Sequence, residues 1–232
     1  MFYHARMQLG FFGQGELERW RNGLAPMRAE LPSHRRKPVG QLVKSLISGR
    51  TRDAVSLAAY RRLGARFGSA GRIAAAPVAE IAETIADVTF AEAKADWLAD
   101  ALQRIGAERA DFDLAFLGAL PLDDALAWLE RLPGVGRKVA ASTLNASVLA
   151  RPVFIVDSHV LRVLQRLRFV GSRAEAKDAS EAVTAAMPHW SADDFLRFHI
   201  ACKRLGQAAC LFERPTCAAC PLARDCPSRL TP

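Results

Sequence analysis

The sequence predicts an all-α fold. Ala, Leu and Arg are abundant among its 232 residues, and half of the residues are hydrophobic, which is enough to form a core. Apolar residues recur three and four positions apart along most of the chain, and Val and Ile rarely alternate with polar residues as they do in strands. No apolar run approaches the roughly 18 residues of a membrane span. Residues 1–20 lack an apolar block followed by a cleavage site, so we expect a cytoplasmic protein with no membrane partner.

The helices follow in order from these patterns. The first is predicted over about residues 16–31, and after a proline-containing break a second begins at Pro38. Thr51 or Asp53 could cap the third helix. Pro77 stands where a first-turn proline belongs, ahead of the next helix. Further helices are expected at about residues 91–105, 122–132, 137–149, 158–167, 173–187 and 191–206.

One apolar segment lacks helical spacing. Val153–Val156, which follows Pro152, has the composition of a strand, but no neighbouring segment offers a partner strand. We therefore interpret it as a buried extended linker. Asp157 and Ser158 come next and are suited to capping the helix that follows.

The charge of the chain is distributed in blocks. The net charge is +8 and the isoelectric point is about 9.7. Residues 1–50 carry a balance of +6, residues 51–130 of −5, residues 131–170 of +6 and residues 171–232 of +1. Two basic blocks around an acidic one favour a face that binds a polyanion. On charge alone, solvated helical faces are an equal alternative.

The segment Leu132–Lys138, with the sequence L-P-G-V-G-R-K, lies between two predicted helices. Gly134 and Gly136 permit positive φ and leave backbone amides uncovered at the start of a helix. There the helix dipole and the free N–H groups favour an anion such as a phosphate, to which Arg137 or Lys138 could add charge. An ordinary tight turn is the alternative, because so short a motif arises often by chance.

All five cysteines lie in the last 31 residues. Four of them have the spacing C-x6-C-x2-C-x5-C, namely Cys210, Cys217, Cys220 and Cys226. Such clustering without a secretory signal favours metal ligation over disulfides. An all-cysteine zinc site usually uses two C-x2-C pairs, and only one is present, so a [4Fe–4S] cluster suits the spacing better than zinc. Cys202 lies outside this set and is expected to be a buried thiol.

These motifs together resemble one known family. The L-P-G-V-G-R-K hairpin, the V-D-S-H sequence around Asp157 and the cysteine spacing, in this order, are similar to those of the endonuclease III family. Its members are helix-hairpin-helix DNA glycosylases with an iron–sulfur cluster. The resemblance extends from about Leu42 to Cys226.

The resemblance implies two helical lobes that flank a DNA-binding cleft. One lobe, residues 31–149, would be a helical barrel that ends in the helix-hairpin-helix. The other lobe, residues 1–30 with 150–232, would hold the iron–sulfur cluster. Lys138 matches the catalytic lysine of the family and Asp157 its catalytic aspartate. The remaining matches are the hairpin residues Gly134, Val135, Gly136 and Arg137, which would bind DNA, and the [4Fe–4S] ligands Cys210, Cys217, Cys220 and Cys226.

Two further positions align with residues that enter the duplex in the family. Arg50 stands where many members place a glutamine that fills the gap left by a flipped base, so the damage preference can differ. Phe90 stands where the family places an apolar wedge, and an aromatic wedge is consistent with intercalation into a kinked duplex. A core phenylalanine is the equal alternative for Phe90.

The resemblance implies base excision repair of duplex DNA that contains damaged bases or abasic sites. A lysine nucleophile implies AP lyase activity through a Schiff base and β-elimination, and adenine-excising relatives lack this lysine. We therefore expect a bifunctional glycosylase and lyase that acts on oxidised or damaged pyrimidines, as a monomer bound to the nucleoid. The alternatives are a member with altered lesion specificity and a non-catalytic DNA-binding iron–sulfur protein.

Overall fold

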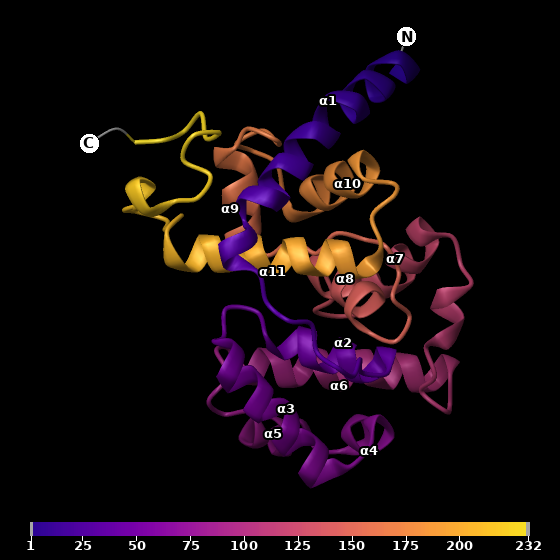
Figure 1. Ribbon diagram of the computed structural model, residues 1–232. Coiled ribbons are helices and arrows are strands. Elements are labelled where there is room, and N and C mark those ends of the chain that lie inside the picture. The colour runs from indigo at the N-terminus through magenta and orange to yellow at the C-terminus, as the bar shows by residue number, and fades with distance from the viewer. Residues whose placement is uncertain (1, 231–232) are drawn as a thin grey trace. The chain divides into compact units, whose positions relative to one another are not determined.

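The computed structural model describes residues 2–230, and helices form nearly all of their regular structure (Figure 1). Over this range the chain has no β-strand, and an isolated backbone bridge joins Arg36 to Ser147. The predicted all-α fold is confirmed. Among the helices of residues 2–230, none is long and apolar enough to cross a membrane.

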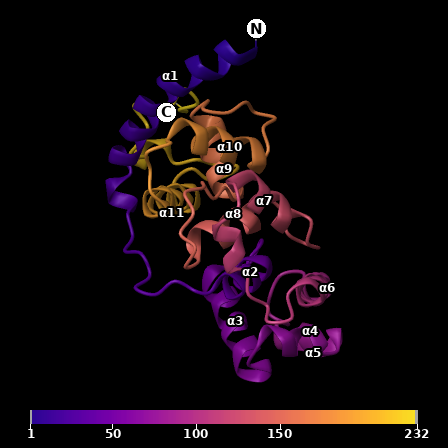
Figure 2. The ribbon, with the colours of Figure 1, turned by 90° about the vertical axis from the view of Figure 1, so that its right-hand side faces the viewer.

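The chain folds into two compact units. The hairpin unit is His34–Arg151, and the cysteine unit combines Met1–Ser33 with Pro152–Pro232. The boundaries expected from the sequence lay after residues 30 and 149. Figures 1 and 2 show the indigo helix α1 beside the orange helix α10, so the two ends of the chain build one unit.

In the hairpin unit, helix α6 packs against three other helices, α2, α4 and α5, and α2 packs in turn against α8. The face that α6 buries carries Ala95, Leu98, Leu102 and Ile105, each at most 1 % exposed and at helical spacing. The helices of this unit are α2 (Pro38–Ile47), α3 (Asp53–Phe67), α4 (Ala70–Ala75), α5 (Val78–Thr84), α6 (Ala91–Glu108), α7 (Leu122–Glu130) and α8 (Arg137–Ala146), with a 3₁₀ turn, η2 (Ala115–Gly118).

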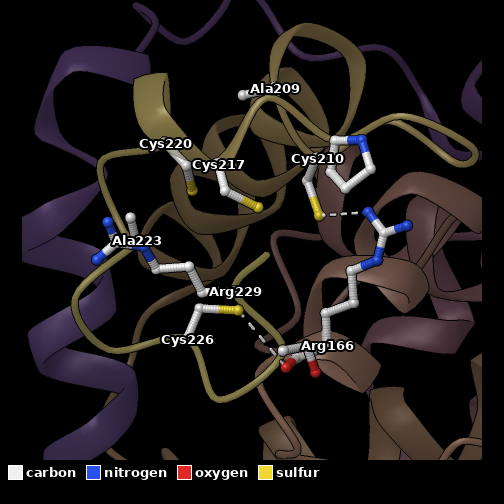
Figure 3. Close-up of a pocket in the computed structure, with 10 residues that line it drawn as sticks. Arg166, Ala209, Cys210, Cys217, Cys220, Ala223, Cys226 and Arg229 are labelled. Carbon is white, nitrogen blue, oxygen red and sulfur yellow. Dashed lines mark hydrogen bonds between the residues drawn. The ribbon is translucent and has the colours of Figure 1, made fainter. Parts of the chain in front are cut away.

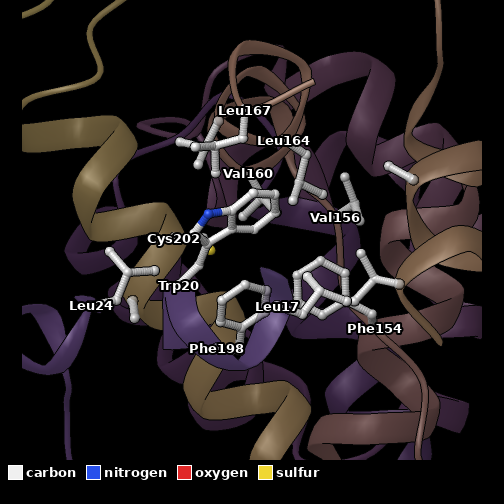
Figure 4. Packing of buried hydrophobic residues seen from close by; sticks show 14 of the residues in the cluster. Leu17, Trp20, Leu24, Phe154, Val156, Val160, Leu164, Leu167, Phe198 and Cys202 are labelled. Carbon is white, nitrogen blue, oxygen red and sulfur yellow. The ribbon is translucent and has the colours of Figure 1, made fainter. Parts of the chain in front are cut away.

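The cysteine unit is built around aromatic side chains from segments far apart in the sequence (Figure 4). Phe198 lies against Phe154 and Trp190, with ring centroids 5.5 and 5.2 Å apart, and Trp20 of the first helix lies edge-on to Phe169. The helices are α1 (Phe2–Gly23), α9 (Ser158–Arg166), α10 (Ala176–Ala186) and α11 (Ala192–Ala208), with the 3₁₀ turns η1 (Ala25–Met27) and η3 (Cys217–Ala219).

The segment Val153–Val156 is a buried extended linker, as expected from the sequence. Each of its four residues is at most 3 % exposed, and none belongs to a helix or strand. Side chains bond its backbone groups: Thr184 Oγ1 accepts from Phe154 N–H, Ser180 Oγ donates to Phe154 O, and His199 Nδ1 lies 2.8 Å from Ile155 O. These bonds offset the cost of burying an unpaired backbone.

Several predicted boundaries are wrong. Helix α1 ends at Gly23 and not near residue 31, because Pro26 cannot continue a helix and the chain turns through η1. Helix α8 ends at Ala146 and not at 149, since Ser147 is extended and bridges to Arg36. The short helix α4 was not predicted.

Two predicted helix starts also differ from the structure by one position. Arg52 is the N-cap of α3 and Asp53 its first residue, so neither Thr51 nor Asp53 caps this helix. Pro77 is the N-cap of α5 and not a first-turn residue. Neither helix has a side-chain cap, so the preference for capping residues misplaced the start of α3, and the preference for a first-turn proline misplaced that of α5.

Candidate functional site

The turn between α7 and α8 depends on a glycine that closely approaches a tryptophan. Gly134 has φ +70°, and a Cβ atom at this position would lie 2.7 Å from Trp97 Cβ on α6. Gly136 is the N-cap of α8, and a Cβ there would meet no atom within 4 Å. The first amides of α8 therefore start from an open and exposed glycine, which is the arrangement that binds anions.

Val135 anchors this turn. Its side chain is 5 % exposed, and its N–H donates to Leu132 O at 3.1 Å. The side chain and the amide of Val135 are therefore engaged within the turn, and its expected contact with DNA stays a prediction.

Arg137 is placed differently from the expectation that it adds charge at a phosphate. Its side chain is only 9 % exposed, and its guanidinium bonds the Glu130 carboxylate at the end of α7. The pair joins the two helices of the hairpin and neutralises a carboxylate that would otherwise repel a phosphate.

Lys138 lies in the first turn of α8, half-buried, and faces the end of α2. Its Nζ donates to Ser48 Oγ at 2.6 Å and to Ser45 O at 3.3 Å. Ser48 Oγ donates in turn to Ser45 O at 2.8 Å. Hydroxyl and carbonyl oxygens therefore orient the ammonium group of Lys138.

A buried polar network lies beside Lys138 that sequence reasoning missed. Gln41 Nε2 donates to Ser45 Oγ and Ser142 Oγ at 3.0 and 3.1 Å, and the two hydroxyls lie 2.9 Å apart. All three residues are at most 7 % exposed. Polar residues at 41, 45 and 48, on one side of a helix by their spacing, were the available signal.

Asp157 is the N-cap of α9 in the cysteine unit. Its Oδ1 accepts from the N–H groups of His159 and Val160, both at 2.9 Å. Burial works to raise the pKa of this carboxyl, but His199, the Val160 amide and Lys203 outweigh it, so the pKa lies below its usual value. Asp157 is therefore an ionised carboxylate at neutral pH as well as a helix cap.

The four predicted cysteine ligands line one pocket, which is formed mainly by the segment that follows α11. Figure 3 shows the sulfur atoms of Cys210, Cys217, Cys220 and Cys226 turned toward the same space. Across residues 2–230, no three His, Cys, Asp or Glu side chains are close enough to hold one metal ion. Cys202 is 1 % exposed in α11 and outside the pocket, as expected for a buried thiol.

The cysteine thiols of the pocket raise one another's pKa values. Burial, together with the charges of neighbouring cysteines, raises the pKa of Cys220 and of Cys226. Such mutual repulsion arises only when thiols are gathered, and a bound cation relieves it.

Two arginines of α9 hold the loop that carries the first cysteine. Arg166 donates to Cys210 Sγ at 3.2 Å and to the carbonyls of Leu211 and Phe212 at 2.6 and 2.8 Å. Arg162 donates to Cys210 O and Gly206 O, both at 2.8 Å. The sequence placed this pair one turn apart in the second basic block, but it did not show that the pair organises the cysteine loop.

Arg50 and Phe90 lie together at the surface of the hairpin unit. Phe90 is 58 % exposed, which contradicts the core alternative. The Arg50 guanidinium carbon lies 5.8 Å from the Phe90 ring centroid, within the range of a cation–π contact. Both residues have positive φ, 53° and 60°, so both turns are held in a conformation that side chains disfavour.

Comparisons with known proteins agree with this geometry. Residues 43–189, more than half of the chain, match the model of the HhH-GPD superfamily of base excision DNA repair proteins. Endonuclease III from Synechocystis is 30 % identical over 82 % of this chain and 81 % of its own length. The chain belongs to the endonuclease III family.

Other endonuclease III proteins and solved structures extend the comparison. Endonuclease III from Thermotoga maritima is 28 % identical over 82 % of each chain. Among structures, a non-covalent endonuclease III–DNA complex superposes with a TM-score of 0.74 at 22 % identity, and covers 93 % of this chain and 95 % of its own. A thermostable thymine-DNA glycosylase superposes with a TM-score of 0.72 at 18 % identity, over 92 % and 96 %. This endonuclease III family member therefore has the fold of DNA glycosylases.

The two hairpin glycines differ in whether a side chain fits at their position, and their alanine variants test this difference. Gly134→Ala forces a Cβ into Trp97 at a residue with positive φ, so we expect the hairpin unit to lose about 1–3 kcal/mol of stability. Gly136→Ala, the matched control, meets no atom and should stay within about 0.5 kcal/mol of the parent. Urea unfolding of both variants measures the difference. Equal losses would contradict the role of Trp97.

Proposed function

We propose that this protein is a bifunctional DNA glycosylase and AP lyase that excises oxidised or damaged pyrimidines from duplex DNA. The observation that carries the proposal is the position of Lys138 Nζ, in the first turn of α8 directly after the hairpin and bonded to Ser48 Oγ. A lysine at this place supplies the amine that the lyase reaction needs. Ser45 of α2 and Ser48, the residue directly after α2, accept from Lys138, and the sequence of α2 contains no carboxylate.

The hairpin is proposed to bind a DNA phosphate through backbone amides. Gly136 starts α8 with open space around it, and the helix dipole favours a negative charge there. Such a contact positions DNA without reading its sequence. Arg137 serves this contact indirectly, because it neutralises Glu130.

Lys138 is proposed to act as the nucleophile. After the damaged nucleotide is flipped out of the duplex, neutral Nζ forms a bond to C1′ of the sugar, and the bond from C1′ to the base breaks as the base leaves with a proton. Opening of the sugar ring gives a Schiff base between Nζ and C1′. Loss of a C2′ proton then expels the 3′ phosphate by β-elimination, and water releases the lysine.

Asp157 is proposed to stabilise the positive charge that develops on the sugar as the base leaves. Its pKa is lowered, so the carboxylate stays ionised at neutral pH and meets this requirement. The bonds from His159 and Val160 fix its orientation before the substrate binds.

The four cysteines are proposed to hold a [4Fe–4S] cluster. Their donor set is entirely thiol, and all four line one pocket, which fits either zinc or a cluster. An all-cysteine zinc site usually takes its ligands from two C-x2-C pairs, and these four cysteines contain one such pair, so their spacing favours the cluster. When bound, the cluster links parts of a loop that has little regular structure.

Arg50 keeps one alternative open. It replaces the neutral gap-filling glutamine that the resemblance implies, so a family member that binds DNA without excising pyrimidines is the second candidate. That candidate retains affinity for duplex DNA and forms no covalent adduct on any lesion.

Borohydride trapping tests the lyase step directly. A duplex with an abasic site should form a covalent adduct with the protein, because reduction fixes the Schiff base. Lys138→Ala should remove the adduct, and Lys177→Ala, an exposed lysine of α10, should leave it unchanged. Mass spectrometry of the adduct identifies the lysine. An adduct that persists in Lys138→Ala would sink the assignment.

Asp157→Asn separates the charge of this residue from its capping bonds. An asparagine oxygen still accepts from the amides of His159 and Val160, so the stability at neutral pH should change by less than about 1 kcal/mol. Because the pKa of Asp157 is lowered, any stability that its charge adds is present above about pH 4 and is lost as the pH falls through the lowered pKa. Turnover on a lesion duplex should fall about 100-fold or more. Unchanged turnover would exclude a catalytic role.

Iron analysis of cysteine variants tests the cluster. The purified protein should be yellow-brown, with about four irons per chain. Cys217→Ser should lose iron and colour, whereas Cys202→Ala, which changes a buried thiol outside the pocket, should retain both. A colourless parent protein with one zinc would refute the cluster and leave the glycosylase proposal in place.

A further inference from the structure

Lys94 is a buried lysine that the proposed reaction does not use. It lies in the first turn of α6 and is 3 % exposed. Its Nζ donates to Ile47 O at 3.0 Å, to Gly49 O at 2.5 Å and to Thr51 Oγ1 at 3.2 Å. All three acceptors are neutral, so the ammonium is buried at a cost with no carboxylate among these bonds to offset it.

The carbonyl groups that accept from Lys94 show that its ammonium group binds the C-terminal end of α2. Ile47 and Gly49 carry carbonyls at the end of α2, where the helix leaves such groups unpaired and the dipole favours a cation. Burial lowers the pKa of Lys94 to about 8, so the group remains mostly protonated at pH 7 and can donate all three bonds.

The same lysine is joined to the turn that carries Phe90. Lys94 N–H donates to Phe90 O at 3.0 Å, and Thr51 Oγ1 accepts from Thr89 N–H at 3.2 Å as well as from Lys94. The turn with Arg50 and the turn with Phe90 therefore meet at one ammonium and one hydroxyl.

The bonds of Lys94 and Thr51 hold two exposed residues, Arg50 and Phe90, in strained backbone conformations. Arg50 and Phe90 both have positive φ, which costs of order 1–3 kcal/mol for residues with side chains and persists only when neighbours impose it. The Phe90 ring is 58 % exposed beneath the Arg50 guanidinium, and both are flat groups on which nucleobases stack. A preassembled stacking surface fits the bases beside the gap that a flipped nucleotide leaves.

We propose that Lys94 is a positioning residue that holds Arg50 and Phe90 together as one wedge, which stacks on the bases at an unpaired site in duplex DNA. This proposal rests on the proposed function, because it requires that the protein binds DNA. It concerns binding and stacking, and it does not involve the Lys138 reaction.

The test uses a duplex with a tetrahydrofuran abasic analogue opposite 2-aminopurine. This analogue cannot form a Schiff base, so the result is independent of trapping. Lys94→Met keeps the side-chain stem and removes the ammonium. It should lower the preference for the abasic duplex over the intact duplex about tenfold, and it should reduce the change in 2-aminopurine fluorescence. If Lys94→Met folds poorly, Thr51→Val replaces it in the test. Thr51 is partly exposed, and its variant should change the preference and the fluorescence in the same direction.

Two further variants distinguish a loss of wedge positioning from a general loss of stability in the hairpin unit. Ile105→Val changes a fully buried residue of the same helix and should leave the preference and the fluorescence change intact. Adding Lys94→Met to Phe90→Ala should have little further effect, because the two act through one structure. Parent-like preference in both Lys94→Met and Thr51→Val, or full additivity with Phe90→Ala, would overturn the proposal. Loss of trapping with an intact wedge signal would instead refute the lyase.

Discussion

The close packing of α9 against α11 is the constraint on which the cysteine unit depends. A Cβ on Gly206 would lie 2.8 Å from His159 Cβ and 3.1 Å from its carbonyl oxygen, so only glycine permits this approach. The approach brings Arg162 within reach of Gly206 O and Cys210 O. Asp157 caps the same nine-residue helix. One short helix therefore positions both a candidate catalytic carboxylate and the start of the cysteine loop.

Helix α6 positions several features of the hairpin unit, as α9 does in the cysteine unit. Phe90 precedes it, and Lys94 and Trp97 follow at intervals of four and three, which is the spacing of one helix face. Phe90 is exposed beside Arg50, Lys94 donates to carbonyls at the end of α2, and Trp97 lies against Gly134. The proposed wedge and the hairpin both contact this one helix, and Lys94 lies on the side of α6 that also carries the core residues Leu98 and Ile105.

Much of this was predictable from the sequence, and the omissions have physical reasons. Helical periodicity identified most helices, and the order of the hairpin, Asp157 and the cysteines indicated the family. The Arg137–Glu130 pair was not predictable, because a charge near a phosphate motif does not reveal which partner it meets after folding. Lys94 was missed for a similar reason: most lysines are solvated, and only the folded chain shows this one buried. Boundaries failed where tertiary contacts such as the Ser147 bridge ended a helix early.

The internal pairing of Arg137 changes how DNA affinity depends on salt. Binding to a polyanion is strengthened by the release of condensed counterions, and each free cation of the protein that neutralises a phosphate adds to the slope. Arg137 pairs with Glu130 instead, so in the proposed complex the hairpin would contact DNA with amide dipoles that displace few ions. The affinity that this proposed contact supplies would therefore persist at ionic strengths that weaken contacts made by solvated lysines and arginines elsewhere.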